Sequence, residues 1–354
     1  MAARTIWILS HARAGDLDQM LALARALGWP AMVKKLSFRA PKLAAAPFMA
    51  RLLFDTRGSD PIDPPWPDLV VCAEGRCSAI ARLIGARAQG AVKTVCLGRP
   101  AGSPASFDLV LTTPQYRLEA GPNIVELALP LPSEIGASGS GDAMLNQLAR
   151  PLTAVLVGGT SLPERLDGEA ATRLAAKAME HAQGGILLFV TSPRTGAGAA
   201  AALARSVPAP HIVHLWQRGA DNPYWSIVKA ADHVVVTSDS VSMVMDALAA
   251  GKPVSIYRLP RHHTARNRAV DWLAGRKEAA WLFDRGIIEV RPDRRLLFEN
   301  LVAQGRLHWF GEAPATETLA PSFAKETALA VAKVKQLFDD PLPSCQPPAS
   351  RNTP

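Results

Sequence analysis

Short runs of branched apolar residues alternate with segments of helical periodicity along most of this 354-residue chain. Runs this short and this apolar, separated by helices, are typical of strands in a parallel sheet covered on both faces. The sequence therefore predicts an α/β protein. The expected strands are residues 6–9, 31–36, 69–72, 93–97, 109–112 and 124–127, then 153–157, 186–191, 211–215, 234–236 and 254–257. The expected helices are residues 17–27, 77–85, 169–183, 198–206, 224–230 and 243–250.

A segment rich in Gly and Ser, residues 132–142, interrupts this alternation, which restarts after it. The chain is also longer than a single core usually supports. We therefore expect two doubly wound, Rossmann-like domains that face a cleft, residues 1–135 and residues 143–338. The pattern leaves open whether the region beyond Arg261 completes the second domain or crosses back to the first. Residues 339–354 are Pro-rich and predict a disordered tail.

The segment AADHVVVTSDSVSMVMDALAAGKPVSIY, residues 230–257, predicts a strand, a hydroxyl-rich turn, a helix and a second strand. Unpaired N–H groups and the positive end of the helix dipole favour an anion at such a helix start. Ser240 and Ser242 could hold a phosphate, and Asp246, one helical turn later, could accept hydrogen bonds from a ribose. The alternative is that these residues are ordinary helix caps.

Polar turns follow other expected strands, and strand ends are where ligands bind in such sheets. Arg194 could grip a phosphate with two hydrogen bonds, and glycines let the main chain approach a ligand closely. The alternatives are a surface ion pair for Arg194 and a simple tight turn at the glycines. Asn222 could cap a helix or contact a base, and capping is favoured. The candidate residues in these turns are Gly159, Thr160, Ser192, Arg194, Thr195, Asn222 and Tyr224.

Five segments together resemble the bacterial and plant family of mitochondrial-fission "elongated mitochondria" proteins. They are HARAGDLDQ, VGGTS, TSPRT, DNPY and ADHVVVTSDSVSMVMDALAAGKPV, in the same order between about residue 5 and about residue 260. That family is similar to GT-B glycosyltransferases such as lipid A disaccharide synthase and the peptidoglycan N-acetylglucosaminyltransferase. The resemblance implies a GT-B-like fold. It also implies that a nucleoside diphosphate lies against Gly159, Thr160, Ser192, Arg194 and Thr195, with Ser240, Ser242 and Asp246 closing the site.

The resemblance implies that the N-terminal turn serves the acceptor. Transfer without a metal needs a base for the acceptor hydroxyl and positive groups for the leaving diphosphate. His11 and Asp16 are the early residues with suitable chemistry at a strand end, and Gln19 is placed to orient one of them. His11 could equally be a helix-start or core histidine. The family is expected to have a Gly-rich, His-containing turn here, and HARAGD keeps only one Gly of it. The family is also expected to have a His and an Asp after the fourth strand, and LTTPQYRL, residues 111–118, lacks both.

From these features we expect a metal-independent, inverting glycosyltransferase that needs no cofactor. Its substrate would be a nucleoside diphosphate sugar, and its acceptor an envelope or lipid-linked molecule at a membrane surface. The alternative is a non-catalytic adaptor that keeps the fold and recruits partners, as the plant relatives' association with the fission machinery suggests. A nicotinamide-dependent nucleotide-sugar epimerase would need an early GxGxxG turn, which the sequence lacks.

The net charge of +8 is spread along the chain, without the basic and aromatic interleaving that stacks nucleotides. We therefore expect no nucleic-acid partner, while protein partners stay unidentified. No signal peptide or long apolar run is visible, which predicts a cytoplasmic protein. Residues 39–54 mix basic and apolar side chains and could attach to the inner membrane surface, or could line the interdomain cleft.

Overall fold

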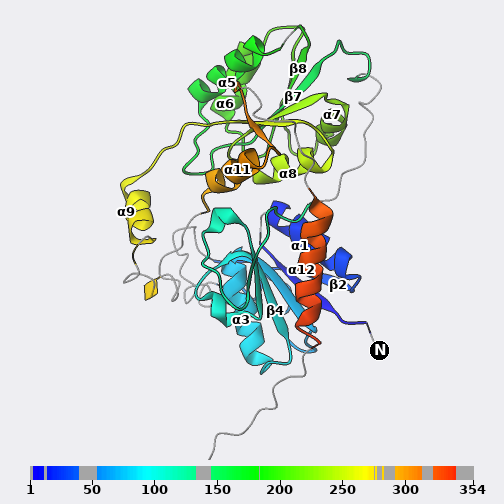
Figure 1. Ribbon diagram of the computed structural model, residues 1–354, viewed down its shortest axis with the longest axis vertical. Coiled ribbons are helices and arrows are strands. Elements are labelled where there is room, and N and C mark those ends of the chain that lie inside the picture. Colours follow the sequence, from blue (N-terminus) through cyan, green and yellow to red (C-terminus); the bar gives the residue numbers. More distant parts are fainter. Residues whose placement is uncertain are drawn as a thin grey trace, which may run out of the picture.

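The computed structural model contains two parallel sheets of six strands each, with helices on both faces (Figure 1). It describes residues 3–11, 14–39, 54–132, 145–182, 184–274, 276, 281–282, 292–312 and 322–339. The predicted α/β class and the predicted pair of doubly wound sheets are confirmed.

The first sheet has the strand order β2-β1-β3-β4-β5-β6, in which every pair is parallel. Its strands are β1 (Ile6–Ser10), β2 (Ala31–Lys35), β3 (Leu69–Gly75), β4 (Lys93–Pro100), β5 (Leu109–Thr112) and β6 (Ile124–Glu126). The connections include α1 (Ala14–Leu27), α3 (Arg76–Arg87) and two 3-10 turns, η1 (Pro104–Ser106) and η2 (Pro114–Tyr116).

The second sheet has the order β12-β11-β10-β7-β8-β9 and is also parallel. Its strands are β7 (Leu152–Val157), β8 (Ile186–Thr191), β9 (Ile212–His214), β10 (His233–Thr237), β11 (Val254–Tyr257) and β12 (His308–Trp309). The helices that follow the first sheet are α5 (Gly168–Glu180), α6 (Ala197–Ser206), α7 (Tyr224–Ala230), α8 (Val241–Ala249), α9 (Ala265–Ala274), α11 (Arg294–Ala303) and α12 (Phe323–Gln336).

Both faces of each sheet are buried, which explains why the strands read as continuous apolar runs. Along β1, Ile6 and Ile8 face a core that includes residues of α1, while Trp7 and Leu9 face the core under α3. The second sheet repeats this alternation, with α7, α8 and α11 on one face and α5 and α6 on the other. The central strands are thereby fixed in register, because a slip of one residue would exchange the two cores.

The last described helix, α12, crosses back and packs on the first sheet beside α1 (Figure 1). Ala330 and Val334 are fully buried in the core that contains Ile6 and Ile8. Glu326 is also buried, and its carboxylate accepts a hydrogen bond from the main-chain N–H of Ala128 at 2.9 Å. The question left open by the sequence is thus answered: β12 and α11 belong to the second sheet, and α12 belongs to the first.

The two sheets face each other along the edges at which β1 and β10 end. A side-chain carbon on Gly15, at the start of α1, would lie 3.4 Å from the Cβ of Ser242, at the start of α8. Asp293, just before α11, donates its N–H to the carbonyl oxygen of Gln115 at 2.8 Å. Its carboxylate also pairs with Arg117 at 2.9 Å. The ends of the strands of both sheets are therefore brought to one interface.

Three regions named from the sequence lie outside the described residues, wholly or nearly so. They are the expected linker from residue 133 onward, residues 40–53 of the basic and apolar stretch, and residues 340–354 of the expected tail. No helix among the described residues is both long and apolar enough to cross a bilayer.

We expect Glu326→Ala to lower the free energy of unfolding by about 1–3 kcal/mol, because the buried N–H of Ala128 then loses its acceptor. The matched control is Glu299→Ala on α11, where an exposed carboxylate pairs with Arg295 one turn away. That change should cost about 0.5 kcal/mol or less. Urea unfolding of the two variants and the parent measures both values. Equal effects would contradict the docking of α12 through Glu326.

Candidate functional site

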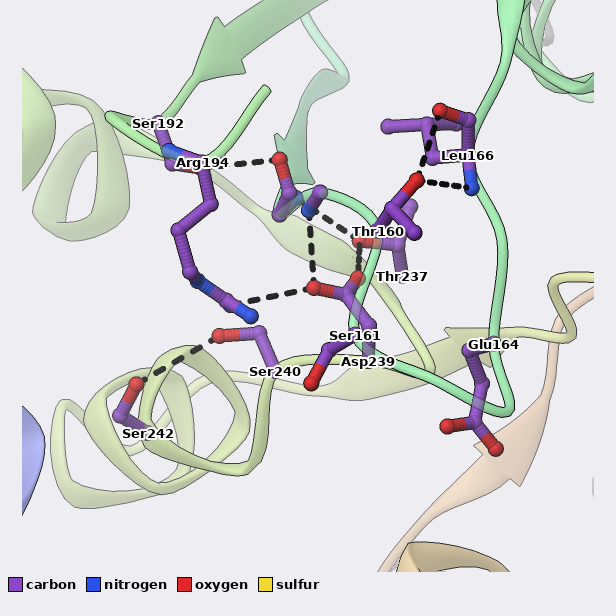
Figure 2. Close-up of polar contacts among 12 residues, drawn as sticks. Thr160, Ser161, Glu164, Leu166, Ser192, Arg194, Thr237, Asp239, Ser240 and Ser242 are labelled. Atoms are coloured by element: carbon purple, nitrogen blue, oxygen red, sulfur yellow. Dashed lines mark hydrogen bonds and ion pairs between the residues drawn. The ribbon is translucent and has the colours of Figure 1, made fainter. Parts of the chain in front are cut away.

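A buried carboxylate, that of Asp239, lies at the centre of the polar contacts beyond the second sheet (Figure 2). Asp239 follows β10, and its carboxylate contacts three polar groups. The main-chain N–H of Gly159 donates at 2.8 Å, the hydroxyl of Thr237 donates at 2.7 Å, and the Arg194 guanidinium lies 3.0 Å away. Asp239 thus connects the ends of β7, β8 and β10, which are neighbours in the sheet.

The two glycines after β7 leave the room that these contacts occupy. A side-chain carbon on Gly158 would lie 2.2 Å from the carboxylate of Asp239. One on Gly159 would lie 2.1 Å from the carbonyl oxygen of Arg194, which is main chain and cannot move alone. The glycine pair therefore permits the close packing of three strand ends, in addition to forming a turn.

Burial raises the pKa of the Asp239 carboxyl above its ordinary value. The Arg194 guanidinium, the Gly159 N–H and the Thr237 hydroxyl act in the opposite direction, because each favours the ionised form. The Arg194 side chain is 44% exposed, whereas that of Asp239 is fully buried. Asp239 consequently holds one side of the guanidinium, and its other side faces outward.

Three of the predicted hydroxyls bond to the protein's own main chain. Ser192 and Thr195 both donate to the carbonyl oxygen of Gly158, and the N–H of Ser192 donates to the Thr195 hydroxyl at 2.9 Å. The Thr160 hydroxyl donates to the carbonyl oxygen of Leu166 and accepts from its N–H, both at 3.1 Å. These side chains fix the turns after β7 and β8.

The predicted hydroxyls of Ser240 and Ser242 lie together at the start of α8, 3.4 Å apart. Ser240 is buried and directly precedes the helix, and Ser242 is exposed in its first turn. Ser240 occupies the N-cap position of α8, and its side chain makes no capping hydrogen bond there. The first N–H groups of a helix have no partner within it, so this end of α8 offers donors beside Arg194 (Figure 2).

Asp246, on α8, accepts a hydrogen bond from the Tyr224 hydroxyl at 2.9 Å. Burial and the neighbouring Asp246 carboxylate raise the pKa of Tyr224 well above its usual range, so the phenol keeps its proton and donates. Asn222 is exposed, and its amide oxygen accepts a hydrogen bond from the N–H of Tyr224 at 3.2 Å, while Pro223 is the residue at the N-cap position of α7.

A buried carboxylate that the sequence did not single out, Glu164, fixes the loop after β7. Arg294 at the start of α11 contacts Glu164 at 2.6 Å and also donates to the carbonyl oxygen of Ser161 at 3.2 Å. Arg261 lies 3.6 Å from the same carboxylate and 3.1 Å from Asp293. Burial raises the pKa of Glu164 despite these two arginines. The loop is thereby tied to α11 and to the interface with the first sheet.

The two candidate catalytic residues of the first half are held differently. His11 donates from Nδ1 to the carbonyl oxygen of Leu36 at 2.9 Å, and its ring packs edge-on against Phe38. In the neutral ring, donation from Nδ1 leaves the lone pair on Nε2. Asp16 lies in the first turn of α1 and lines a cavity together with Gln19, and His11 is not among the lining residues. Within the described part of the chain, no cluster of three His, Cys, Asp or Glu side chains is arranged to hold a metal.

Gly159→Ala should lower the free energy of unfolding by about 1–3 kcal/mol, because the new methyl group meets the main chain of Arg194. Gly198→Ala on α6 is the control, since a methyl group there meets no atom within 4 Å. The control should be neutral or stabilising by up to about 1 kcal/mol, as expected for Ala in a helix. Denaturant unfolding of both variants checks the prediction, and an equal response would contradict the close approach at Gly159.

The raised pKa of Asp239 predicts a pH-dependent difference between the parent protein and Asp239→Asn. A proton bound more tightly in the folded state stabilises it below the ordinary pKa of 3.8, and this stabilisation is lost as the pH rises through the raised value. The variant stays neutral and has no such loss. Relative to the parent, it should therefore become less destabilised in urea unfolding as the pH rises above 3.8. A difference that is constant or grows with pH would contradict the raised pKa.

Several proteins of solved structure share this fold. This chain is similar to S. aureus MnaA in its co-structure with UDP, with a TM-score of 0.52 and 11% identity over 95% of this chain and 97% of that one. It is similar to the spinosyn forosaminyltransferase SpnP, with a TM-score of 0.51 and 16% identity over 96% of each chain. It is also similar to the UDP-GlcNAc 2-epimerase of Methanocaldococcus jannaschii, with a TM-score of 0.50 and 10% identity over 95% and 100%.

Identities this low show the fold, and they confirm the GT-B-like architecture expected from the sequence. No curated protein matches the chain. The model of one protein family, described as Mitochondrial fission ELM1, matches residues 14–316, which is most of the chain. The resemblance in the sequence motifs is therefore confirmed, and this chain belongs to the mitochondrial fission ELM1 family.

Proposed function

We propose that this protein is a glycosyltransferase that binds a nucleoside diphosphate sugar at the carboxyl ends of the strands of its second sheet. The observation that supports the proposal best is the Arg194 guanidinium, which is 44% exposed and lies at 3.0 Å from the buried Asp239. Because Asp239 fixes one side of it, Arg194 has a set direction toward the start of α8. A pre-positioned guanidinium beside a helix N-terminus is well suited to a diphosphate.

The donors around this point suit an anion better than any other ligand. The first turn of α8 supplies main-chain N–H groups and the positive end of the helix dipole. Ser240 and Ser242 add two hydroxyls, and that of Ser240 makes no capping hydrogen bond to the helix. The carboxylate that pairs with Arg194, that of Asp239, is fully buried and faces the glycine turn. A diphosphate would meet Arg194 before it met that carboxylate.

The remaining predicted residues fit a nucleoside beside the diphosphate. Asp246 lies one helical turn after Ser242, and its Oδ2 is oriented by the Tyr224 hydroxyl. An oriented carboxylate at that distance from a phosphate site is a suitable acceptor for ribose hydroxyls. The polar groups of four further residues make hydrogen bonds within the protein, so these residues shape the site: Gly159, Thr160, Ser192 and Thr195.

In the first half, His11 is the better candidate for the base that takes the acceptor proton. Donation from Nδ1 to Leu36 leaves the lone pair on Nε2, the tautomer that a base requires. Asp16 lies instead at a cavity and would bind the acceptor. The acceptor class suggested by the resemblance, an envelope or lipid-linked molecule at a membrane surface, remains a prediction.

The second candidate is a non-catalytic adaptor, and one observation favours it. The hydroxyls of Thr160, Ser192 and Thr195 are fully used by the main chain, so the turns keep their shape without any ligand. Such an adaptor would retain the fold and lose nucleotide binding. The two candidates therefore differ in whether a nucleoside diphosphate binds.

Calorimetric titration of the purified protein with UDP, ADP and GDP tests the proposal. We expect at least one of them to bind, and Arg194→Ala to weaken that binding roughly 10- to 100-fold, the effect of removing a charged hydrogen-bonding partner of phosphate. Arg205→Ala is the control, because Arg205 is an exposed arginine at the far end of α6. It should leave the affinity unchanged. If none of the three nucleotides binds, the adaptor is the better description.

A further inference from the structure

One carboxylate, that of Asp293, is shared by arginines of both halves of the protein. Asp293 directly precedes α11, which lies on the side of the second sheet that faces the first (Figure 1). One of its oxygens lies 2.9 Å from the guanidinium of Arg117, which belongs to the connection between β5 and β6. The other oxygen lies 3.1 Å from the guanidinium of Arg261, which lies beyond the end of β11. Asp293 therefore joins the two halves by its side chain.

The contacts continue from Asp293 to the turn after β7. Arg261 lies 3.6 Å from the carboxylate of Glu164, which belongs to that turn. Arg294 contacts the same carboxylate at 2.6 Å and donates to the carbonyl oxygen of Ser161 at 3.2 Å. Within the turn, the N–H of Ser161 donates to the carbonyl oxygen of Glu164 at 3.0 Å. Positive and negative side chains thus alternate from the first sheet to the turn.

These side chains differ in burial, which decides how each can act. Those of Glu164 and Arg294 are 4% and 14% exposed. Because little water reaches Glu164, its carboxylate depends on the two arginines for its contacts. The Arg117 side chain is 39% exposed, so its ion pair adds little stability by itself. Arg117 is therefore suited to fixing the position of Asp293, while the buried pairs beyond it carry that position onward.

We propose that Arg117 and Asp293 are positioning residues for the turn after β7. Arg117 holds Asp293 from the side of the first sheet, and Asp293 in turn sets the positions of Arg261 and of the adjacent Arg294. These two arginines hold Glu164 and, with it, the turn. The second sheet thus receives the shape of its candidate nucleotide site partly from the first.

The turn matters because it contains Gly159. The N–H of Gly159 donates to Asp239 at 2.8 Å, and Asp239 lies 3.0 Å from the guanidinium of Arg194. A displacement of Gly159 changes the direction in which Asp239 holds that guanidinium. The effect on a nucleotide rests on the proposed function, whereas the effect on the turn does not. Because coupling between sites is reciprocal, a nucleotide that orders the turn strengthens the contact between the two halves by the same factor.

Amide hydrogen exchange of the full chain without nucleotide tests the effect on the turn. The Gly159 amide reports on the end of β7, and the Leu152 amide, which donates to Asp232 at 2.7 Å, reports on its start. Arg117→Gln should speed exchange at Gly159 roughly two- to fivefold, the size of one partly exposed ion pair. It should leave Leu152 unchanged. Asp293→Asn removes the partner of two arginines and should have the larger effect at Gly159.

Two further variants serve as controls. Arg117→Lys keeps the charge and should restore most of the protection at Gly159. Arg150→Gln breaks a pair with Asp232 at the start of β7, so it should speed exchange at Leu152 and leave Gly159 unchanged. An equal rise at both amides in Arg117→Gln would indicate a general loss of stability and would overturn the proposal. No change at Gly159 would overturn it as well.

UDP titration of the same variants tests the effect on the nucleotide. Arg117→Gln should weaken UDP binding roughly two- to fivefold, and Arg150→Gln should not. In an Asp293→Asn background, Arg117→Gln should have no further effect, because the pair is already broken. An equal loss in both backgrounds would indicate direct attraction between Arg117 and the phosphates, and it would overturn the positioning role, as would an unchanged affinity in Arg117→Gln.

The two measurements separate this proposal from the proposed function. Faster exchange at Gly159 in Arg117→Gln, without UDP binding to the parent protein, would refute the nucleotide site and leave the positioning of the turn standing. UDP binding to the parent, with exchange at Gly159 unchanged in Arg117→Gln, would refute the positioning role alone.

Discussion

The buried carboxylate of Asp239 is the interaction on which the candidate site depends. It lies where β7, β8 and β10 end, and each of these strands contributes a group to it: the Gly159 N–H, the Arg194 guanidinium and the Thr237 hydroxyl. A carboxylate in such a place is stable only when its hydrogen bonds are made. The absence of side chains at Gly158 and Gly159 makes those bonds sterically feasible. The geometry of the turns, and with it the direction of Arg194, therefore follows from one buried charge.

The two halves present different side chains where the strands of their sheets end. The second half presents a guanidinium, a helix start and hydroxyls, which favour an anion. The first half presents a small cavity whose lining includes Asp16 and Gln19. The fold alone does not distinguish a glycosyltransferase from an epimerase, because a forosaminyltransferase and a UDP-GlcNAc 2-epimerase both share it.

The fold could be predicted from the sequence because burial on both faces turns each strand into an apolar run, and the helices between them keep their period. The site was only partly predictable. Their positions after apolar strands identify Arg194, Ser240 and Ser242 as candidates. The role of Asp239 depends instead on a hydrogen bond with Gly159, 80 residues earlier in the chain. The hydroxyls of Ser192 and Thr195 looked like ligand groups, and local main-chain carbonyls use them instead. The docking of α12 depends on a contact between Glu326 and Ala128 that no local pattern contains.

The return of α12 to the first sheet has a consequence for synthesis. Domains usually fold one by one as the chain leaves the ribosome, starting from the N-terminus. Here the core around Ile6 and Ile8 is completed by Ala330 and Val334, which are made more than three hundred residues later. The second sheet, β7 to β12, can close while part of the first core is still open to water. The half that is made first is thus the half that is finished last, and a truncated chain would expose that apolar face.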